Sequence, residues 1–138
     1  MGKWIKVDLL PITPVSYNIN TNKIGIAVST YTQESTEKSR FQIIERSLDS
    51  LENYVKKNVI NGNHSSLINN TYVVIVVDGK IPNRHQDILK KYENIFDIYY
   101  RPNNGGVART KNTSIRLLLE KQVDIGFLMD DDVEYKDN

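Results

Sequence analysis

The chain has 138 residues, of which 39% are hydrophobic and 25% charged, as in folded domains rather than disordered tails or membrane proteins. Eighteen Lys and Arg against seventeen Asp and Glu leave a formal net charge of +1, which removes any bulk electrostatic case for a nucleic acid partner. The absence of cysteine excludes disulfide scaffolds and thiolate zinc sites. No leader pattern is evident at the start, and no apolar run approaches the roughly 20 residues of a transmembrane helix, so we expect a cytoplasmic protein without a membrane segment.

The first half of the chain predicts an arm, a strand and a long helix. Residues 1–23 are expected to form an extended N-terminal arm, because Pro11 and Pro14 bar a regular helix there. The apolar run Ile24–Ser29 then predicts a buried strand. A helix ending near Asn58 is predicted from apolar residues at alternating spacings of three and four: Phe41, Ile44, Leu48, Leu51 and Val55.

The second half of the chain continues this alternation of strands and helices. The predicted elements are a strand at Tyr72–Val77, a helix after Pro82, a strand at Phe96–Tyr100, a helix at Val107–Lys121 and a strand at Val123–Met129. This order predicts an α/β domain over residues 24–138, with an open, mostly parallel, Rossmann-like sheet and helices on both faces. Ligands of such sheets bind beyond the carboxyl ends of the strands.

Three successive aspartates, Asp130–Asp132, follow the last predicted strand. Their mutual repulsion in a partly dry cleft would raise their pKa values unless a cation compensates. Mg²⁺ or Mn²⁺ is suited to that role, since both ions prefer oxygen ligands and complete their shells with water and phosphates. The alternative is a solvated turn in which the acids merely end the strand.

Further candidates lie at the ends of other predicted elements. Asp78 ends the second strand and could accept hydrogen bonds from a ligand, although Asp-Gly is also a common turn. Arg109 and Lys111 lie in the first turns of the helix after Gly105-Gly106 and could meet phosphate, or simply be solvated. Tyr31 could stack on a base or be packed.

In this order and spacing, these segments resemble the donor-binding half of a family 2 glycosyltransferase, the inverting group with the GT-A fold. Four segments carry the resemblance: Ile24–Tyr31, Val74–Gly79, Asn104–Asn112 and Phe127–Val133. They are similar to the family's first strand with its Thr-Tyr end, its base-binding strand, its Gly-rich helix start and its Asp-x-Asp strand. Lys111 stands where the family has Arg, which keeps the cation but loses a bidentate fork.

The resemblance implies a donor site for a UDP- or GDP-linked sugar, held with Mn²⁺ or Mg²⁺, and an unknown acceptor. It assigns Thr30, Tyr31, Asp78 and Asp130 to the nucleoside, and Lys111 and Arg109 to the nucleotide or its phosphates. The acidic run has two possible registers. Alignment on Leu128 and Val133 makes Asp131 the metal ligand, with Asp132 close behind, and this is the register we favour. Alignment on Asp-x-Asp pairs Asp130 with Asp132.

The family places its general base and acceptor site well beyond the acidic motif, so no base is assigned and the chain is expected to be part of a larger enzyme. Two other classes of protein share features of this pattern. A nucleotidylyltransferase should carry a Gly-rich Arg-Leu signature after the first strand, which Ser29–Glu34 lacks. A non-catalytic nucleotide- or metal-binding module, such as a receiver, could use an acidic cluster, but Thr30–Gln33 supplies no paired acids.

Overall fold

The computed structural model describes residues 3–6, 23–60 and 71–136. Its strands are β1 (Lys3–Lys6), β2 (Ile24–Thr30), β3 (Thr71–Val77), β4 (Asp97–Tyr100) and β5 (Ile125–Asp130), and its helices are α1 (Lys38–Ile60), α3 (Asn83–Lys90) and α4 (Gly106–Glu120). The predicted alternation of strands and helices is therefore confirmed. The last strand ends one residue later than expected, so Asp130 belongs to β5 and Asp131 follows it.

The strands form one sheet in the order β1-β5-β2-β3-β4. β5, β2, β3 and β4 run parallel, whereas β1 pairs antiparallel with β5 at the edge. The mostly parallel, Rossmann-like open sheet is thus confirmed. Of the arm expected over 1–23, Lys3–Lys6 is a strand of the sheet, and residues 7–22 lie outside the described residues.

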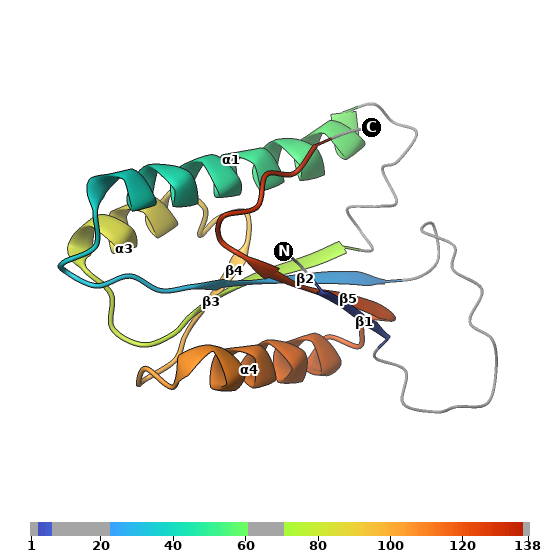
Figure 1. Cartoon of the computed structure of the whole chain (residues 1–138). Helices are drawn as coiled ribbons and strands as arrows, with labels where there is room; N and C mark the ends of the chain where they lie inside the picture. Colours follow the sequence, from blue (N-terminus) through green and yellow to red (C-terminus); the bar gives the residue numbers. More distant parts are fainter. Residues whose placement is uncertain (1–2, 7–22, 61–70, 137–138) are drawn as a thin grey trace.

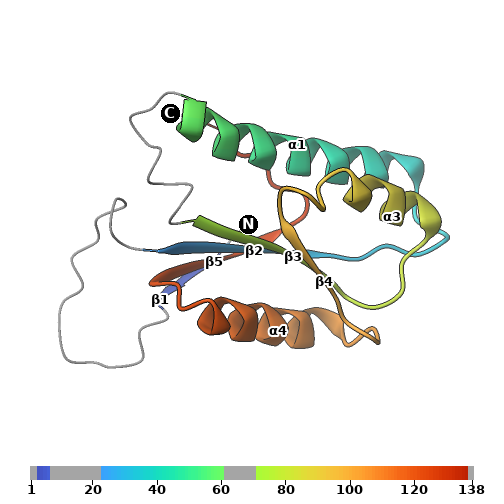
Figure 2. The same ribbon diagram turned by 180° about the vertical axis from the view of Figure 1, so that it is seen from behind.

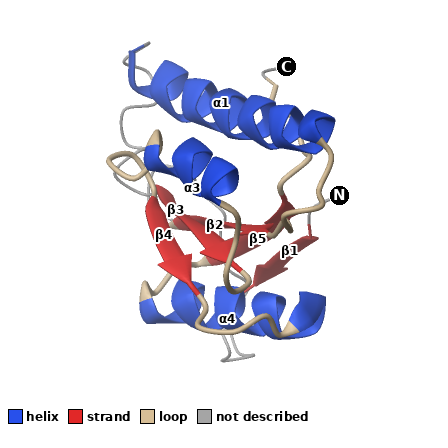
Figure 3. Ribbon diagram, turned by 90° about the vertical axis from the view of Figure 1, so that its left-hand side faces the viewer, coloured by secondary structure: helices blue, strands red, loops and turns tan. Residues whose placement is uncertain are grey.

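Helices cover both faces of the sheet, as predicted (Figures 1 and 2). α1 and α3 lie on one face and α4 lies on the other, which the end-on view shows as three layers (Figure 3). β2, β3 and β4 follow one another outward, and the chain then crosses by α4 to β5 on the other side of β2. The direction of winding reverses between β2 and β5, and ligands of open α/β sheets bind at such a switch point.

Each face of the sheet has its own apolar core. On the α1 and α3 face, the predicted helical stripe is buried at Phe41, Ile44, Leu48 and Leu51, while Val55 is partly buried. Burying such side chains stabilises the fold by roughly 1.5–3 kcal/mol each. The α4 face is smaller and is centred on Ala27, Val74, Val76, Leu118, Val123 and Leu128.

Helix α4 packs against the sheet through a buried face. Thr110 and Ser114 are buried on α4 at a spacing of four, with Leu118 one turn further. A Cβ atom added to Gly25 in β2 would lie 2.6 Å from Leu118 Cδ2 and 2.9 Å from Val123 Cγ1, so these two side chains would have to shift to admit it. The first turns of α4 are thereby held beside the carboxyl end of the sheet. No helix within the described ranges combines the length and apolar character needed to span a bilayer.

Candidate functional site

A cleft of about 500 Å³ opens at the carboxyl ends of β2, β3 and β5, beside the start of α4. Its lining consists of Ser29, Thr30, Tyr31, Gln33, Arg40, Asp78, Asn104, Gly106, Val107, Thr110, Lys111, Asp130, Asp131 and Asp132. Seven of the eight residues predicted from the sequence are among them. The eighth, Arg109, is exposed on α4 and does not line the cleft.

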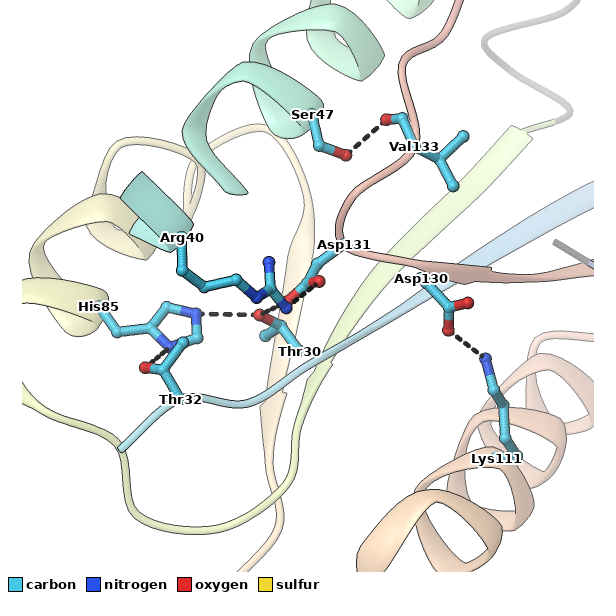
Figure 4. A network of polar contacts seen from close by, with 9 residues as sticks. All are labelled: Thr30, Thr32, Arg40, Ser47, His85, Lys111, Asp130, Asp131 and Val133. Carbon is cyan, nitrogen blue, oxygen red and sulfur yellow. Dashed lines mark hydrogen bonds and ion pairs between the residues drawn. The ribbon is translucent and has the colours of Figure 1, made fainter. Parts of the chain in front are cut away.

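The three successive aspartates do not share one environment. The side chain of Asp131 is 5% exposed, whereas that of Asp130 is 46% exposed, and Asp132 is an exposed residue. Asp130 is the last residue of β5, whereas Asp131 and Asp132 lie in the turn that follows it. Figure 4 shows Asp131 directed toward α1 and Asp130 toward α4.

Asp131 is held by two donors from separate elements. Its Oδ2 accepts a hydrogen bond of 2.6 Å from the Thr30 hydroxyl, and its Oδ1 lies 2.5 Å from Nη2 of Arg40 on α1 (Figure 4). Burial raises the pKa of the Asp131 carboxyl, against the opposing effect of these two partners. The carboxylate therefore joins β2, β5 and α1 at the floor of the cleft.

Asp130 pairs with a cation on the opposite helix. Its Oδ1 lies 3.1 Å from Nζ of Lys111, whose side chain is 24% exposed (Figure 4). Burial alone would raise the pKa of Asp130, but the Lys111 ammonium outweighs it, and the pKa is lowered below the usual value. Asp130 is thus charged at neutral pH and faces the cleft.

The segment that follows the acidic run is tied to α1. The Ser47 hydroxyl donates to the Val133 carbonyl at 2.6 Å, and the Tyr135 amide donates to the Ser50 hydroxyl at 2.9 Å (Figure 4 shows the first). These bonds fix the chain on the far side of Asp132. The exposed carboxylate of Asp132 therefore projects from a backbone that is anchored at both ends.

Asp78 accepts hydrogen bonds from backbone amides at the start of α4. Its carboxylate accepts hydrogen bonds from the Gly105 amide at 3.0 Å and the Gly106 amide at 2.9 Å, and it pairs with Arg101. Burial alone would raise the pKa of Asp78, but these bonds, led by that of Gly105, lower it. Gly79 follows at φ +98°, where a Cβ would lie 2.5 Å from the Asn104 amide nitrogen. Asp78 therefore holds the start of α4 and Arg101 against the end of β3.

Two residues of this region were not singled out as site residues from the sequence. Arg40 lies on α1, and its side chain reaches Asp131 and lines the cleft. Its Nη1 is buried and has no hydrogen-bond partner among the described residues. His85 lies on α3, is 0% exposed and contacts Thr30 and Thr32. Neither pairing is local, so spacing along the chain gave no signal for it.

The burial of His85 predicts a loss of stability in mild acid. Burial, reinforced by the charge of Arg40, lowers the pKa of His85 to about 4 from the ordinary 6.5. Below pH 6.5 the unfolded chain therefore binds a proton at His85 that the folded chain does not bind, so the free energy of unfolding decreases as the pH is lowered. Between pH 6.5 and about pH 5 the expected loss is about 2 kcal/mol.

Urea unfolding of the wild type and of His85→Gln over this pH range checks that expectation. The variant, which cannot titrate at this position, should show a flatter profile. Parallel profiles for the two proteins would contradict it.

The lining of the cleft is electrostatically unbalanced. It holds four carboxylates against the two cations Arg40 and Lys111, a formal net charge of −2. Within the described part of the chain, no three His, Asp or Glu side chains converge as a ready-made metal site. Asp130 and the exposed Asp132 both line the cleft and offer hard oxygen ligands, which suit Mg²⁺ or Mn²⁺ when water and phosphate complete the shell.

Comparison with known proteins gives one informative similarity. No family model matches the chain. The chain is 45% identical, over 116 residues, to a protein of Acanthamoeba polyphaga mimivirus named "Uncharacterized glycosyltransferase R363". The matched segment makes up 84% of this chain and 40% of that relative, so the chain spans well under half of the relative's length. The similarity supports a glycosyltransferase.

Proposed function

We propose that this chain binds the sugar donor of an inverting glycosyltransferase of family 2 with the GT-A fold. The donor would be a UDP- or GDP-linked sugar, held together with Mn²⁺ or Mg²⁺. The observation that carries the proposal is the convergence of Asp78, Lys111 and the acidic run in one cleft at the switch point of the sheet. The mimivirus relative supports the reaction class.

The metal ligands we propose are Asp132 and Asp130. A cleft with a net charge of −2 would repel a diphosphate, and a divalent ion removes that repulsion. Asp131, which the motif alignment favoured as a ligand, is committed to Thr30 and Arg40 inside the protein. Its burial supports the Asp130 and Asp132 register, in which Asp131 positions the two flanking carboxylates.

The nucleotide would lie along the walls of the same cleft. Tyr31, which is partly buried at the tip of β2, offers a ring for the base, and Asp78 at the end of β3 also lines the cleft. Thr30 was expected to contact the nucleoside, but the residue is only 4% exposed, and its hydroxyl donates a hydrogen bond to Asp131. Lys111 and Arg40, which both line the cleft, are the donors we assign to the phosphates.

A bound divalent ion would neutralise charge on the diphosphate leaving group. The residues of this chain orient the donor, and they keep Asp130 ionised through Lys111. Inverting transfer also needs a general base that deprotonates the attacking hydroxyl, and we assign none of the cleft residues to it. The transfer to an acceptor is proposed for a longer protein of the relative's kind.

Isothermal titration calorimetry with UDP and GDP tests the donor site on the 138-residue chain. We expect binding of one nucleotide in the presence of Mn²⁺ or Mg²⁺, and at least about tenfold weaker binding in EDTA, since the ion would offset the repulsion between the acidic cleft and the diphosphate. Glu134→Gln removes an exposed acid beyond the motif and should leave the affinity unchanged. Equal affinity in EDTA would instead favour a metal-independent nucleotide-binding module.

A further inference from the structure

A buried histidine lies directly beneath the acidic floor of the cleft. His85, in the first turn of α3, is 0% exposed and does not line the cleft. Its Nε2 lies 2.9 Å from Thr30 Oγ1, and its Nδ1 lies 2.7 Å from Thr32 Oγ1 (Figure 4). The edge of its ring system meets Phe41 at a centroid distance of 6.2 Å, which fixes the plane of the imidazole.

The hydrogens of this network can be assigned by counting. A threonine hydroxyl has one hydrogen, and that of Thr30 is donated to Asp131 Oδ2 at 2.6 Å. Thr30 Oγ1 can therefore only accept from His85, so Nε2 must carry the ring hydrogen. A neutral imidazole has one N–H, and Nδ1 then accepts from the Thr32 hydroxyl. The chain of donors runs from Thr32 through His85 and Thr30 to Asp131.

We propose that His85 is a positioning residue for the acidic cleft: its Nε2–H holds the Thr30 hydroxyl with its single hydrogen directed at Asp131. Asp131 lies between Asp130 and Asp132 in the chain, so its side chain sets the backbone from which both flanking carboxylates project. The effect of His85 on donor binding rests on the proposed function. The hydrogen-bond chain and the position of Asp131 are independent of that function.

The ring tautomer is the first test, and it needs neither a variant nor a nucleotide. ¹⁵N spectra of the histidine-labelled chain should show one imidazole that stays neutral with its hydrogen on Nε2 from about pH 8 down to about pH 5. His85→Gln assigns that signal, because His64 remains. A hydrogen on Nδ1, or a charged ring over this range, would overturn the proposal.

A matched pair of variants tests the positioning. In His85→Gln the amide nitrogen can occupy the place of Nε2 and donate to Thr30, whereas in His85→Asn the shorter amide reaches only the Nδ1 side. The ¹³C signal of the Asp131 carboxyl should move in His85→Asn and stay near its wild-type position in His85→Gln. This readout is independent of nucleotide binding.

Donor binding should follow the same division. We expect His85→Asn to weaken Mn²⁺-dependent UDP binding by about tenfold, and His85→Gln to keep most of the wild-type affinity. A tenfold loss is the size of effect expected when a residue that orients metal ligands is removed. Wild-type affinity in a folded His85→Asn would overturn the positioning role. If the wild type binds no nucleotide but the Asp131 signal still moves in His85→Asn, the proposed function is wrong and the hydrogen-bond chain is confirmed.

Discussion

Replacing Asp130 and Asp132 together by asparagine is expected to abolish the metal dependence of UDP binding and to weaken binding in Mn²⁺ by about 100-fold. The physical reason is that both carboxylates face the cleft, where they are the ligands we propose for the divalent ion. Asparagine keeps the size of each side chain but removes its charge. Calorimetric titration of UDP with and without EDTA measures both effects.

Two controls accompany this double variant. Glu134→Gln makes a similar change of charge two residues beyond Asp132, outside the cleft lining, and should bind UDP as the wild type does. Lys111→Gln removes the ammonium that pairs with Asp130 and should weaken binding without removing its dependence on metal. Retention of metal-dependent binding by the double variant would exclude Asp130 and Asp132 as the ligands.

Asp131→Ala is expected to lower the free energy of unfolding by about 3 kcal/mol, which is far more than a surface substitution causes. Asp131 is 3% exposed, and removal of its carboxylate leaves the Arg40 guanidinium and the Thr30 hydroxyl without their acceptor. The value lies at the lower end of the range for broken buried pairs, because the Arg40 side chain remains 35% exposed. Urea unfolding followed by circular dichroism measures it.

Asp132→Asn is the matched control for this substitution, since it alters the neighbouring acid of the same run. Asp132 is exposed, so the change in the free energy of unfolding should stay within about 0.5 kcal/mol. The two variants should thus separate stability from ligand binding within a run of three identical residues. Equal losses of stability in the two variants would contradict the distinction between a buried Asp131 and an exposed Asp132.

The fold could be predicted in most of its elements because each strand is a short apolar run and each helix carries a periodic stripe. The stripe from Phe41 to Leu51 is buried as expected, and β3 has more buried residues than β2, β4 or β5. The strand β1 was missed because its register depends on pairing with β5, more than a hundred residues away. Local propensity within Lys3–Lys6 carries no signal for that partner.

The site could be predicted where its residues follow the strands directly. Asp78 and the acidic run meet in the cleft because the carboxyl ends of parallel strands share one edge. The division of the acidic run was not anticipated, because it depends on the turn after β5 and on the distant partners of Asp131, Thr30 and Arg40. The partners Arg40 and His85 come from helices α1 and α3, and only the packing of those helices brings them to Thr30 and Asp131.

The central claim, that a divalent ion binds among the tips of the parallel strands, is tested most directly by paramagnetic broadening of backbone amide signals. Mn²⁺ added with UDP to the ¹⁵N-labelled chain should broaden the amides of Asp130–Asp132 and of Ser29 and Thr30 first. The amides of Ile24 and Thr71, at the other ends of β2 and β3, should broaden last. Broadening centred on Ile24 and Thr71, or spread evenly over the sheet, would contradict the account.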